Sequence, residues 1–420
     1  MPAPLKAAST NEVLDLFART RARTDALVAP LCPEDMMLQS MEDASPAKWH
    51  LAHTTWFFEE FILRPRLKDY TSPDDRFAFL FNSYYVQAGP RHARDKRGLV
   101  SRPDGEAVRS YRSYVEDALS DLLAQDRDDA EDIAGLVELG CHHEMQHQEL
   151  LVTDLLHGLS FNALLPVYKD PEPLAVGQEV PLTFTRHDGG LVEIGHNGGA
   201  FAYDCEGPRH RVFLAPFQMA NRPVTNRDWI TFIEDGGYSD SRLWLMEGHA
   251  VAQREEWGHP LYWWKRDDEW WSYTLRGPQP VSLDAPVVHV SYYEADAFAR
   301  WADARLPTEA EHEIAFQEIP ISGNLMGDAH ALGAFRPLPG NGIWGDVWEW
   351  TASDFAPYPG FSAPEGALGE YNGKFMVNQR VLRGGSCATP REQMRITYRT
   401  FFYPQQRWQM LGLRLAKDAV

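Results

Sequence analysis

Cysteine is scarce in this chain. The 420 residues contain four cysteines, Cys32, Cys141, Cys205 and Cys387, which are scattered and form no CxxC pair. So few cysteines in a chain of this length do not make a disulfide framework. The cysteine content therefore predicts a protein of a reducing compartment.

Long hydrophobic runs are also lacking. No stretch approaches the roughly 18 apolar residues that a membrane helix needs. Residues 1–6, MPAPLK, lack the apolar core of a signal peptide. Both observations predict a soluble, cytoplasmic protein without a membrane partner.

Positive charge is in deficit. The chain has 40 Lys and Arg residues against 60 Asp and Glu residues, which gives a formal net charge of -20. Such a surface repels phosphate backbones and anionic lipid headgroups, so nucleic acid is not an expected partner. The apolar share of 44% and the charged share of 24% are ordinary globular values. The length predicts two or three folded domains.

The sequence divides into two parts with different patterns. Up to residue 165, apolar residues recur at intervals of three and four, which is typical of a helical bundle. Residues 166–182 are rich in proline, which predicts a linker. Residues 183–420 hold short β-like segments punctuated by Gly and Pro. The predicted fold class is α+β, a helical bundle followed by a loop-rich mixed domain.

Two histidines lie on the apolar stripe of a helix predicted over residues 128–159. His143 and His147 are four residues apart, so they project from one face of that helix. Leu150 and Leu151 continue the same stripe. Two imidazoles that face the interior of a bundle leave up to four ring nitrogens to satisfy, so something must bind them.

For the HxxxH pair alone, the simpler interpretation is two core histidines bonded to carboxylates or water. His53 adds a third histidine, because it lies among Trp49, Trp56 and Phe57 on another amphipathic helix and is expected to point inward. Three inward histidines from two helices predict a metal site with open coordination positions.

Other polar residues nearby are placed less well for binding a metal. Glu149 lies two residues beyond His147, about 200° around the helix, so a site of two histidines and this carboxylate is geometrically awkward. We expect Glu149 around the site or at the surface. We expect the same of His50, His142 and His157.

Several motifs in one order resemble the sulfoxide synthases of ergothioneine biosynthesis (EgtB type). In the first half these are WHLAH at 49–53, HEMQHQE at 143–149 and the loop that contains Tyr84 and Tyr85. The second half is similar to the formylglycine-generating-enzyme fold in NRPVTN at 221–226, LPTEAE at 306–311, GDVWEW at 345–350 and RGGS at 383–386. The resemblance spans nearly the whole chain. It implies a DinB-like four-helix bundle over residues 1–165, followed by a formylglycine-generating-enzyme-like domain over residues 183–420.

The second half departs from true formylglycine-generating enzymes in one respect. Those enzymes depend on a pair of cysteines near the end, whereas here only Cys387 follows the RGGS segment. The resemblance therefore implies that this half retains a fold and a wall of the cleft without the parent chemistry. It also implies that Trp348 and Arg383 hold the fold together and are not catalytic.

The resemblance implies Fe(II) held by His53, His143 and His147. Three imidazoles leave three positions on an octahedral iron, enough for a substrate thiolate, a substrate imidazole and O₂. By similarity, the enzyme joins cysteine or γ-glutamylcysteine to C2 of the imidazole of hercynine, which is Nα-trimethylhistidine, and oxidises the sulfur to a sulfoxide. These small molecules are the implied partners, and the sequence predicts no oligomeric state.

Two further sites follow from the resemblance. In one branch of the family a tyrosine of this loop donates a proton or an electron beside the iron, which implies Tyr84, with Tyr85 as second choice. The alternative is an aromatic pair packed across the domain boundary. Arg91 and Arg94 are the implied contacts for the carboxylate of cysteine, because a guanidinium binds carboxylates bidentately. The alternative is a solvated basic loop, to which we assign Arg97.

Phe401 and Phe402 lie where another branch of the family carries a Trp-Asp pair for hercynine binding. Aromatic faces can still hold a trimethylammonium group. Together with residues 79–98, this change favours the branch that uses free cysteine. Ordinary core packing is the alternative role for both residues.

Three other functions remain open on the sequence alone, and a fourth related function is disfavoured. A selenoneine synthase would use the same scaffold, iron and hercynine, with a selenosugar as donor. A zinc- or nickel-dependent thiol transferase of the DinB type would need no O₂. A noncatalytic binding protein would hold a structural metal. Ovothiol synthases are related, but they usually carry a methyltransferase domain for which 420 residues leave no room.

Overall fold

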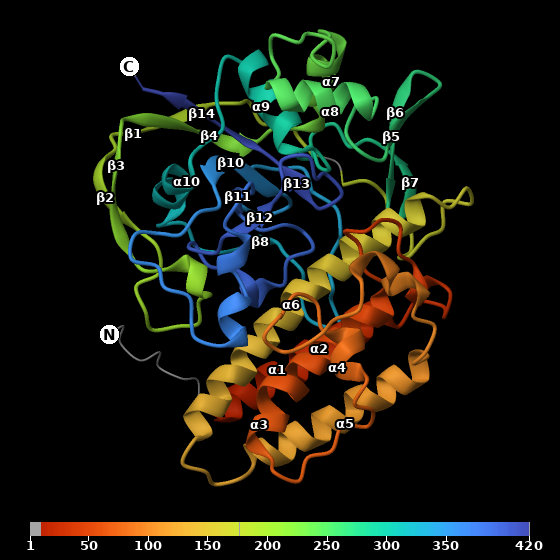
Figure 1. The fold of residues 1–420 in the computed structure, drawn as a ribbon. Coiled ribbons are helices and arrows are strands. Elements are labelled where there is room, and N and C mark those ends of the chain that lie inside the picture. The colour runs from red at the N-terminus through yellow and green to blue at the C-terminus, as the bar shows by residue number, and fades with distance from the viewer. Residues whose placement is uncertain (1–9, 176, 420) are drawn as a thin grey trace.

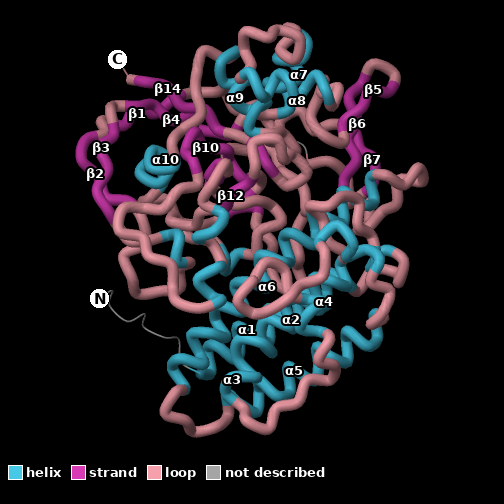
Figure 2. Tube along the Cα trace, viewed as in Figure 1, coloured by secondary structure: helices cyan, strands magenta, loops and turns pink. Residues whose placement is uncertain are grey.

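The computed structural model describes residues 10–175 and 177–419 and consists of two parts. The first part is helical and lies at the bottom of Figure 1, and the second lies above it. Figure 2 shows the same division, with helix below and a mixture of strand, loop and short helix above. The α+β fold class with an N-terminal helical bundle is confirmed.

The bundle consists of four long helices, α1, α2, α5 and α6. Helix α6 contacts the other three, and α2 also contacts α5. The bounds are α1 Thr10–Val28, α2 Ala47–Phe58, α5 Gly105–Leu123 and α6 Ala130–Ser160, with short α3 at Arg64–Arg66 and α4 at Phe77–Phe81. A π-helical turn, Glu59–Leu63, directly continues α2. The long helix predicted over residues 128–159 is α6.

Helix α5 shows how the sequence sets the bundle. The Asp104 side chain accepts a hydrogen bond from the backbone N–H of Ala107 and so caps the first turn. Apolar residues then recur every three or four positions, and the ones that lie on this stripe are buried: Val108, Tyr111, Val115, Leu119 and Leu122. An amphipathic stripe of this kind packs one face of the helix into the core and leaves the other to water.

Helices α2 and α6 approach closely because Gly140 has no side chain at their contact. A Cβ atom at Gly140 would meet the ring of Phe58 at 2.4 Å. Every residue of α2 is buried, so this helix lies inside the bundle. The contact sets the spacing between the helix that carries His53 and the helix that carries His143.

A buried carboxylate, Glu144, connects three helices. It accepts hydrogen bonds from Arg21 Nη1 at 2.8 Å, from Thr24 Oγ1 at 2.6 Å and from Arg112 Nη2 at 2.9 Å. Burial alone would raise the pKa of Glu144, but Arg112 and Arg21 outweigh burial and hold this pKa at about 2. The ionised group fixes the rotation of α6 about its axis, and with it the direction of the adjacent His143.

A long connection leads from α6 to the second part. The described residues of this connection, 161–175 and 177–183, contain no helix or strand. It packs on both parts, because the Tyr168 hydroxyl donates to the Leu27 carbonyl and the Tyr273 hydroxyl donates to the Pro166 carbonyl. The domain boundaries predicted at residues 165 and 183 fall inside this connection and stay a prediction.

The second part contains several small sheets. Strands β1, β4 and β14 form one sheet, β12, β11, β10 and β13 a second, and β5, β6 and β7 a third, while β2 pairs with β3 and β8 with β9. The strand bounds are β1 Phe184–His187, β2 Gly190–Ile194, β3 His210–Leu214, β4 Phe217–Pro223, β5 Trp263–Arg266, β6 Glu269–Thr274, β7 Gly277–Pro280, β8 Gly323–Asn324, β9 Trp344–Gly345, β10 Trp348–Asp354, β11 Arg380–Arg383, β12 Thr400–Phe402, β13 Leu411–Gly412 and β14 Arg414–Asp418. Strand β10 is antiparallel to β11 and parallel to β13.

In the described residues, four α-helices accompany these sheets. Their bounds are α7 Asn226–Glu234, α8 Met246–Arg254, α9 Tyr292–Trp301 and α10 Glu309–Phe316. Helix α9 contacts α7 and α8, whereas α10 contacts strands of three sheets. Capping boxes begin α7, α9 and α10 at Thr225, Ser291 and Thr308. Two of these caps lie in the NRPVTN and LPTEAE motifs, which therefore serve the fold.

The other two motifs of this part are also structural. Gly345 of the GDVWEW motif has φ +81°, and a Cβ atom there would meet the Asn324 carbonyl oxygen at 2.2 Å, so only glycine fits. Arg383 of the RGGS motif is buried and donates to Glu309 at 2.9 Å. Arg399 donates to the same carboxylate at 2.8 Å. These contacts agree with a structural role for Arg383.

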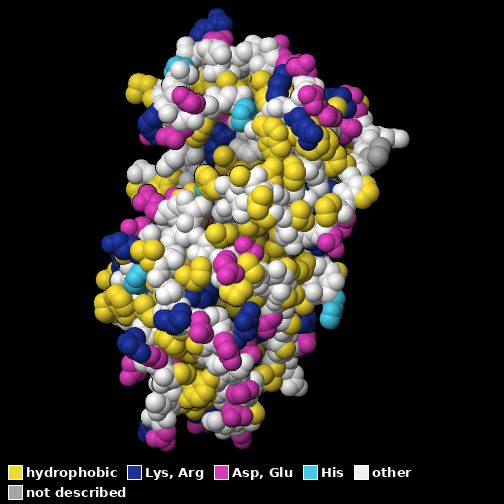
Figure 3. Space-filling view, turned by 90° about the vertical axis from the view of Figure 1, so that its right-hand side faces the viewer, with side chains coloured by type: hydrophobic (Ala, Val, Ile, Leu, Met, Phe, Trp, Pro, Cys, Tyr) yellow, Lys and Arg dark blue, Asp and Glu magenta, His cyan; other side chains and the backbone are white. Residues whose placement is uncertain are grey.

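The surface mixes charges of both signs. On the face shown in Figure 3, acidic and basic side chains are interspersed over both parts of the molecule. Among the described residues, no helix has the length and apolar character needed to cross a membrane.

The Gly140 contact generates a stability prediction with a matched control on the same helix. We expect Gly140→Ala to lower the free energy of unfolding by about 1–2 kcal/mol, because overpacking against Phe58 outweighs the better helix propensity of alanine. Gly135 has open space around its Cα, so Gly135→Ala should raise this free energy by about 0.5–1 kcal/mol. Thermal and urea unfolding would measure both. Equal stabilisation by the two substitutions would show that α2 and α6 separate without cost.

Candidate metal centre and its cavity

A cavity of about 360 Å³ lies at the seam between the two parts. The bundle contributes residues of α2 and α6 and of the loops around residues 43–45, 83–84 and 94–97, whereas the second part contributes β10, β12 and the loops around them. A space of this size suits small-molecule ligands. Its walls therefore come from segments that are far apart in the sequence.

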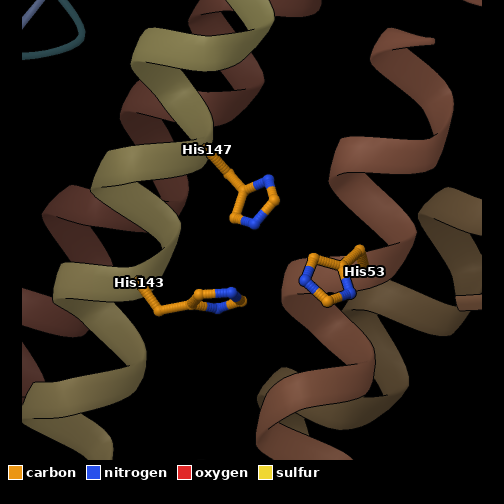
Figure 4. Close-up of side chains that lie close together, drawn as sticks. All are labelled: His53, His143 and His147. Carbon is orange, nitrogen blue, oxygen red and sulfur yellow. The ribbon is translucent and has the colours of Figure 1, made fainter. Parts of the chain in front are cut away.

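Three histidines converge beside this cavity, and two of them, His143 and His147, line it. His53 projects from α2, and His143 and His147 project from the facing helix α6 (Figure 4). Each offers a ligand atom, and these atoms all lie within 4.8 Å of one another. The ring centroids are 4.6 Å apart for His53 and His147, 4.6 Å for His143 and His147, and 5.0 Å for His53 and His143.

Buried ring nitrogens of His53 and His143 have no hydrogen-bond partners. Nδ1 of His53 lies 2.6 Å from the Phe81 carbonyl oxygen, which can only accept, so Nδ1 carries the proton and Nε2 presents a lone pair. That Nε2 is buried and unpartnered, as are both ring nitrogens of His143. Buried polar atoms normally have a partner, so a cluster of this kind is a candidate ligand site. Three converging imidazole lone pairs fit a divalent transition metal.

All three imidazoles are neutral in this environment. Burial lowers the pKa of His143 to about 3. Burial, reinforced by neighbouring histidines, holds the pKa values of His53 and His147 well below the ordinary range. Since a histidine binds a metal only in its neutral form, the site is prepared for a metal at physiological pH.

A second contact holds His147. Its Nδ1 lies 2.8 Å from Nδ1 of His50, and Nε2 of His50 lies 3.3 Å from Oδ2 of Asp154. The sequence left open whether His50 and His142 lie around the site or at the surface. Both are buried, so neither lies at the surface. His142 stacks on Phe201 with ring centroids 3.7 Å apart.

Aromatic rings support His53 from both directions along α2. Trp49 stacks on it with centroids 4.5 Å apart and an interplanar angle of 12°, and Trp56 stacks at 5.5 Å and 19°. Arg97 then covers the Trp49 ring, with its guanidinium carbon 3.5 Å from the ring centroid. The column of stacked groups fixes the His53 ring in the orientation seen in Figure 4.

The structure corrects the assignment of Arg97 to a solvated loop. Arg97 is 5% exposed and lines the cavity, it donates to Ser45 Oγ at 2.9 Å, and its Nε has no hydrogen-bond partner. Burial lowers the pKa of Arg97 to about 9, so the group remains a cation at neutral pH. The assignment was wrong because the stacking surface that buries Arg97 comes from Trp49, which is distant in sequence.

The two arginines that the sequence did single out lie differently. Arg94 lines the cavity rim, where Nη2 donates to the Asp43 carbonyl oxygen at 2.5 Å. Arg91 is exposed and lies outside the residues that line the cavity. The structure therefore brings Arg94 and Arg97 to the site, and leaves Arg91 in solvent.

Tyr84 lines the cavity, whereas Tyr85 is fully buried behind it. Their rings stack with centroids 4.5 Å apart, and the Tyr84 hydroxyl lies 3.4 Å from the Tyr85 hydroxyl. Burial raises the pKa of Tyr84 above its ordinary value, so the phenol keeps its proton at neutral pH. The second part clamps this loop, because Glu370 accepts from the backbone of residues 86 and 87 and Lys374 donates to the Tyr84 carbonyl.

Phe401 and Phe402 lie on β12 and both line the cavity. Phe401 stacks on Phe355 with centroids 3.9 Å apart and an angle of 15°. Phe402 lies 6.3 Å from Trp408, measured between ring centroids. Both are half-buried, so each presents part of its ring to the cavity.

Sequence reasoning missed a polar cluster beside His143. The Tyr371 hydroxyl donates to Gln146 Oε1 at 2.5 Å, and Gln146 Nε2 donates to the Tyr398 hydroxyl at 3.1 Å. The Tyr371 ring centroid is 5.7 Å from that of His143. The position of Gln146 directly before His147 could have indicated it. The tyrosines gave no signal, because they lie 225 and 252 residues further along the chain.

Glu149 joins the two parts and lies outside the histidine set. Its Oε1 accepts hydrogen bonds from Trp348 Nε1 at 2.6 Å, Ser386 Oγ at 2.7 Å and Thr389 Oγ1 at 3.0 Å. This agrees with the expected place of Glu149 around the site. It also gives Trp348 and Ser386, from two motifs of the second part, a direct contact with α6.

Comparisons with known proteins define the class. Residues 16–151 match the DinB superfamily, and residues 178–325 and 338–419 match the sulfatase-modifying factor enzyme 1-like domain. The chain is therefore a two-domain protein of the DinB and sulfatase-modifying-factor type.

Individual relatives define the family more closely, and two of them match over nearly the whole length of the chain. The chain is 32% identical to the hercynine oxygenase of Mycobacterium tuberculosis over 439 residues, covering 96% of this chain and 97% of the relative. It is 30% identical to the hercynine oxygenase of Mycolicibacterium thermoresistibile, covering 99% and 96%. Ergothioneine biosynthesis protein 1 of Schizosaccharomyces pombe is 27% identical over 233 residues, covering 52% of this chain and 28% of the relative.

The chain belongs to the hercynine oxygenase family, and it is an oxidoreductase. The resemblance to the sulfoxide synthases of ergothioneine biosynthesis, stated from the motifs, is confirmed.

Proposed function

We propose that this protein is an Fe(II)- and O₂-dependent sulfoxide synthase that joins a thiol, cysteine or γ-glutamylcysteine, to C2 of the imidazole of hercynine. The observation that carries the proposal is a set of three imidazoles beside the cavity between the two parts. Their ligand atoms lie within 4.8 Å of one another, and His53 and His143 have buried nitrogens without a hydrogen-bond partner. Membership of the hercynine oxygenase family supports the same reaction.

His53, His143 and His147 would hold the iron, which would supply O₂ activation and a meeting point for the two substrates. The overall reaction balances without a further reductant. One C–H bond of hercynine and one S–H bond of the thiol break, a C–S bond forms, one oxygen atom of O₂ is bound to sulfur and the other leaves as water. The protein must therefore position two substrates and relay the protons released from their C–H and S–H bonds to the water that leaves.

Arg97 is the group best suited to the carboxylate of the thiol substrate. It is a buried cation at the cavity wall, its Nε is unpartnered, and its stacking on Trp49 places it one ring away from His53. An anion at this position would complete its hydrogen bonds. Arg94 at the rim would add a second contact.

The aromatic side of the cavity suits hercynine. Phe401, Phe402 and Trp408 line the wall contributed by the second part. Aromatic faces attract a quaternary ammonium group, so this wall would hold the trimethylammonium group while the imidazole reaches toward the histidines. Tyr84 is the proposed proton donor, since its phenol is protonated and it lines the same cavity.

The main test is aerobic incubation of Fe(II)-loaded protein with hercynine and cysteine, in competition with γ-glutamylcysteine and a selenosugar. We expect a product with the summed mass of hercynine and the thiol, minus two hydrogens and plus one oxygen, with one O₂ consumed per product. His53→Ala, His143→Ala and His147→Ala should each lose iron and activity. His157→Ala is the control, because His157 lies on the same helix and bonds to Ser40.

Three outcomes would contradict this function. Turnover without O₂ on zinc or nickel would indicate a thiol transferase. Preference for the selenosugar would indicate a selenoneine synthase. Full iron occupancy in all three histidine variants would refute the ligand set.

The arginine assignment has a matched test. We expect Arg97→Met to raise the KM for the thiol by about 10–100-fold, because a charge-assisted contact with the substrate carboxylate is lost. Arg91→Met should change this KM less than about twofold, because Arg91 is in solvent. Steady-state kinetics with each substrate varied would measure both. A rise in the KM for hercynine instead of the thiol would mean that the two pockets are exchanged.

The two adjacent tyrosines provide another matched pair. Tyr84→Phe removes one hydroxyl at the cavity wall, and we expect the rate of sulfoxide formation to fall at least about 10-fold while iron content and both KM values stay near wild type. Tyr85→Phe should have a much smaller effect, because its hydroxyl lies behind Tyr84. Rapid-quench product analysis would compare them. Loss in Tyr85→Phe alone would transfer the role to that residue.

A further inference from the structure

Two buried residues outside the three histidines connect to one of them, the first directly and the second through the first. His50 is 3% exposed and Asp154 is 6% exposed. His50 lies between Asp154 and His147, with one ring nitrogen 3.3 Å from the carboxylate and the other 2.8 Å from Nδ1 of His147. The three residues thus form a continuous chain of hydrogen bonds that ends at the candidate metal centre.

The direction of the protons along this chain follows from its ends. A carboxylate accepts hydrogen bonds, so Nε2–H of His50 donates to Asp154. With the ring proton of His50 on Nε2, its Nδ1 is an acceptor, and Nδ1–H of His147 donates to it. His147 is left with its lone pair on Nε2, which is the nitrogen free to bind a metal. The chain therefore selects one tautomer of His147.

Asp154 is itself fixed by both parts of the molecule. Its Oδ2 accepts from the backbone N–H of Ser45 at 2.9 Å, and its Oδ1 accepts from Trp408 Nε1 at 3.0 Å. Trp408 belongs to the second part, 254 residues further along the chain. The carboxylate that ends the chain is thus positioned by the docking of the second part on the bundle.

We propose that Asp154 and His50 are positioning residues that set the tautomer and orientation of His147 for metal binding. This inference rests on the metal centre of the proposed function. Carboxylates and carbonyls that accept the second N–H of a ligating histidine orient the ring and raise its basicity. His53 donates its second N–H to a backbone carbonyl. His147 donates to an imidazole that itself donates to a carboxylate, and this makes His147 the stronger electron-pair donor to the metal.

The test uses the full-length protein and Co(II) as the probe, with the dissociation constant measured by competition with a chelator and the site geometry by visible absorption. His50→Phe leaves the N–H of His147 without an acceptor, so we expect the dissociation constant to rise about 10–100-fold. His50→Asn places an oxygen close to the original Nδ1, so its dissociation constant should stay within about threefold of that of wild type. Asp154→Asn keeps an acceptor and loses the charge, so its dissociation constant should lie between those of His50→Asn and His50→Phe.

The control is His142→Phe, which replaces another buried histidine of the bundle, at 5% exposed. Its ring contacts Phe201, Tyr203 and Gln393. It should leave Co(II) affinity within about twofold of wild type. If His50 had a purely structural role, the apolar variant His50→Phe would have higher thermal stability and higher Co(II) affinity than His50→Asn. That order would overturn the proposal.

The two proposals fail in different ways. If wild type binds no Co(II), the metal centre is refuted and the positioning role with it. If wild type binds Co(II) and His50→Phe binds it equally well, only the positioning role is refuted. Should His50→Phe not fold, Asp154→Asn decides, because wild-type affinity and an unchanged Co(II) spectrum in that variant would refute the role of the carboxylate.

Discussion

Three neutral imidazoles converge in one place, and two of them have buried nitrogens without a hydrogen-bond partner. Leaving such groups buried and unpaired is unfavourable by roughly 1–3 kcal/mol each, and the protein supplies no partner to Nε2 of His53 or to either ring nitrogen of His143. Burial also keeps the rings uncharged at neutral pH. The rest of the structure can be understood as what is needed to hold this arrangement and to bring substrates to it.

The bundle provides the spacing and orientation of the ligands. Gly140 allows α2 and α6 to approach, and the ionised Glu144 locks the rotation of α6. Trp49 and Trp56 fix the plane of His53 by stacking. None of these residues offers a ligand atom to the histidine set, yet each restricts where a ring nitrogen can lie. A metal site on rigid helices needs this support because small displacements of ligands change its geometry.

The helical fold and the histidine set could be predicted from sequence because both depend on local periodicity. The positions of His143 and His147 relative to Leu150 and Leu151 placed both rings inside, and His53 followed from its aromatic neighbours. Arg97 and the Gln146–Tyr371 contact could not be predicted, because they depend on which distant surfaces meet. The arginine loop offered three candidates within seven residues, and only packing against Trp49 separates the buried one from the solvated ones.

The second part completes the site without contributing a histidine to it. Its aromatic strand β12 and Trp408 form the wall opposite the bundle, and Glu370 and Lys374 clamp the loop that carries Tyr84. Two carboxylates of α6, Glu149 and Asp154, accept hydrogen bonds from tryptophans of this part. Both residues follow the HxxxH pair along the helix. The same helix that presents two metal ligands is therefore also the helix on which the second part docks, so closure of the cavity and alignment of the ligands depend on one interface.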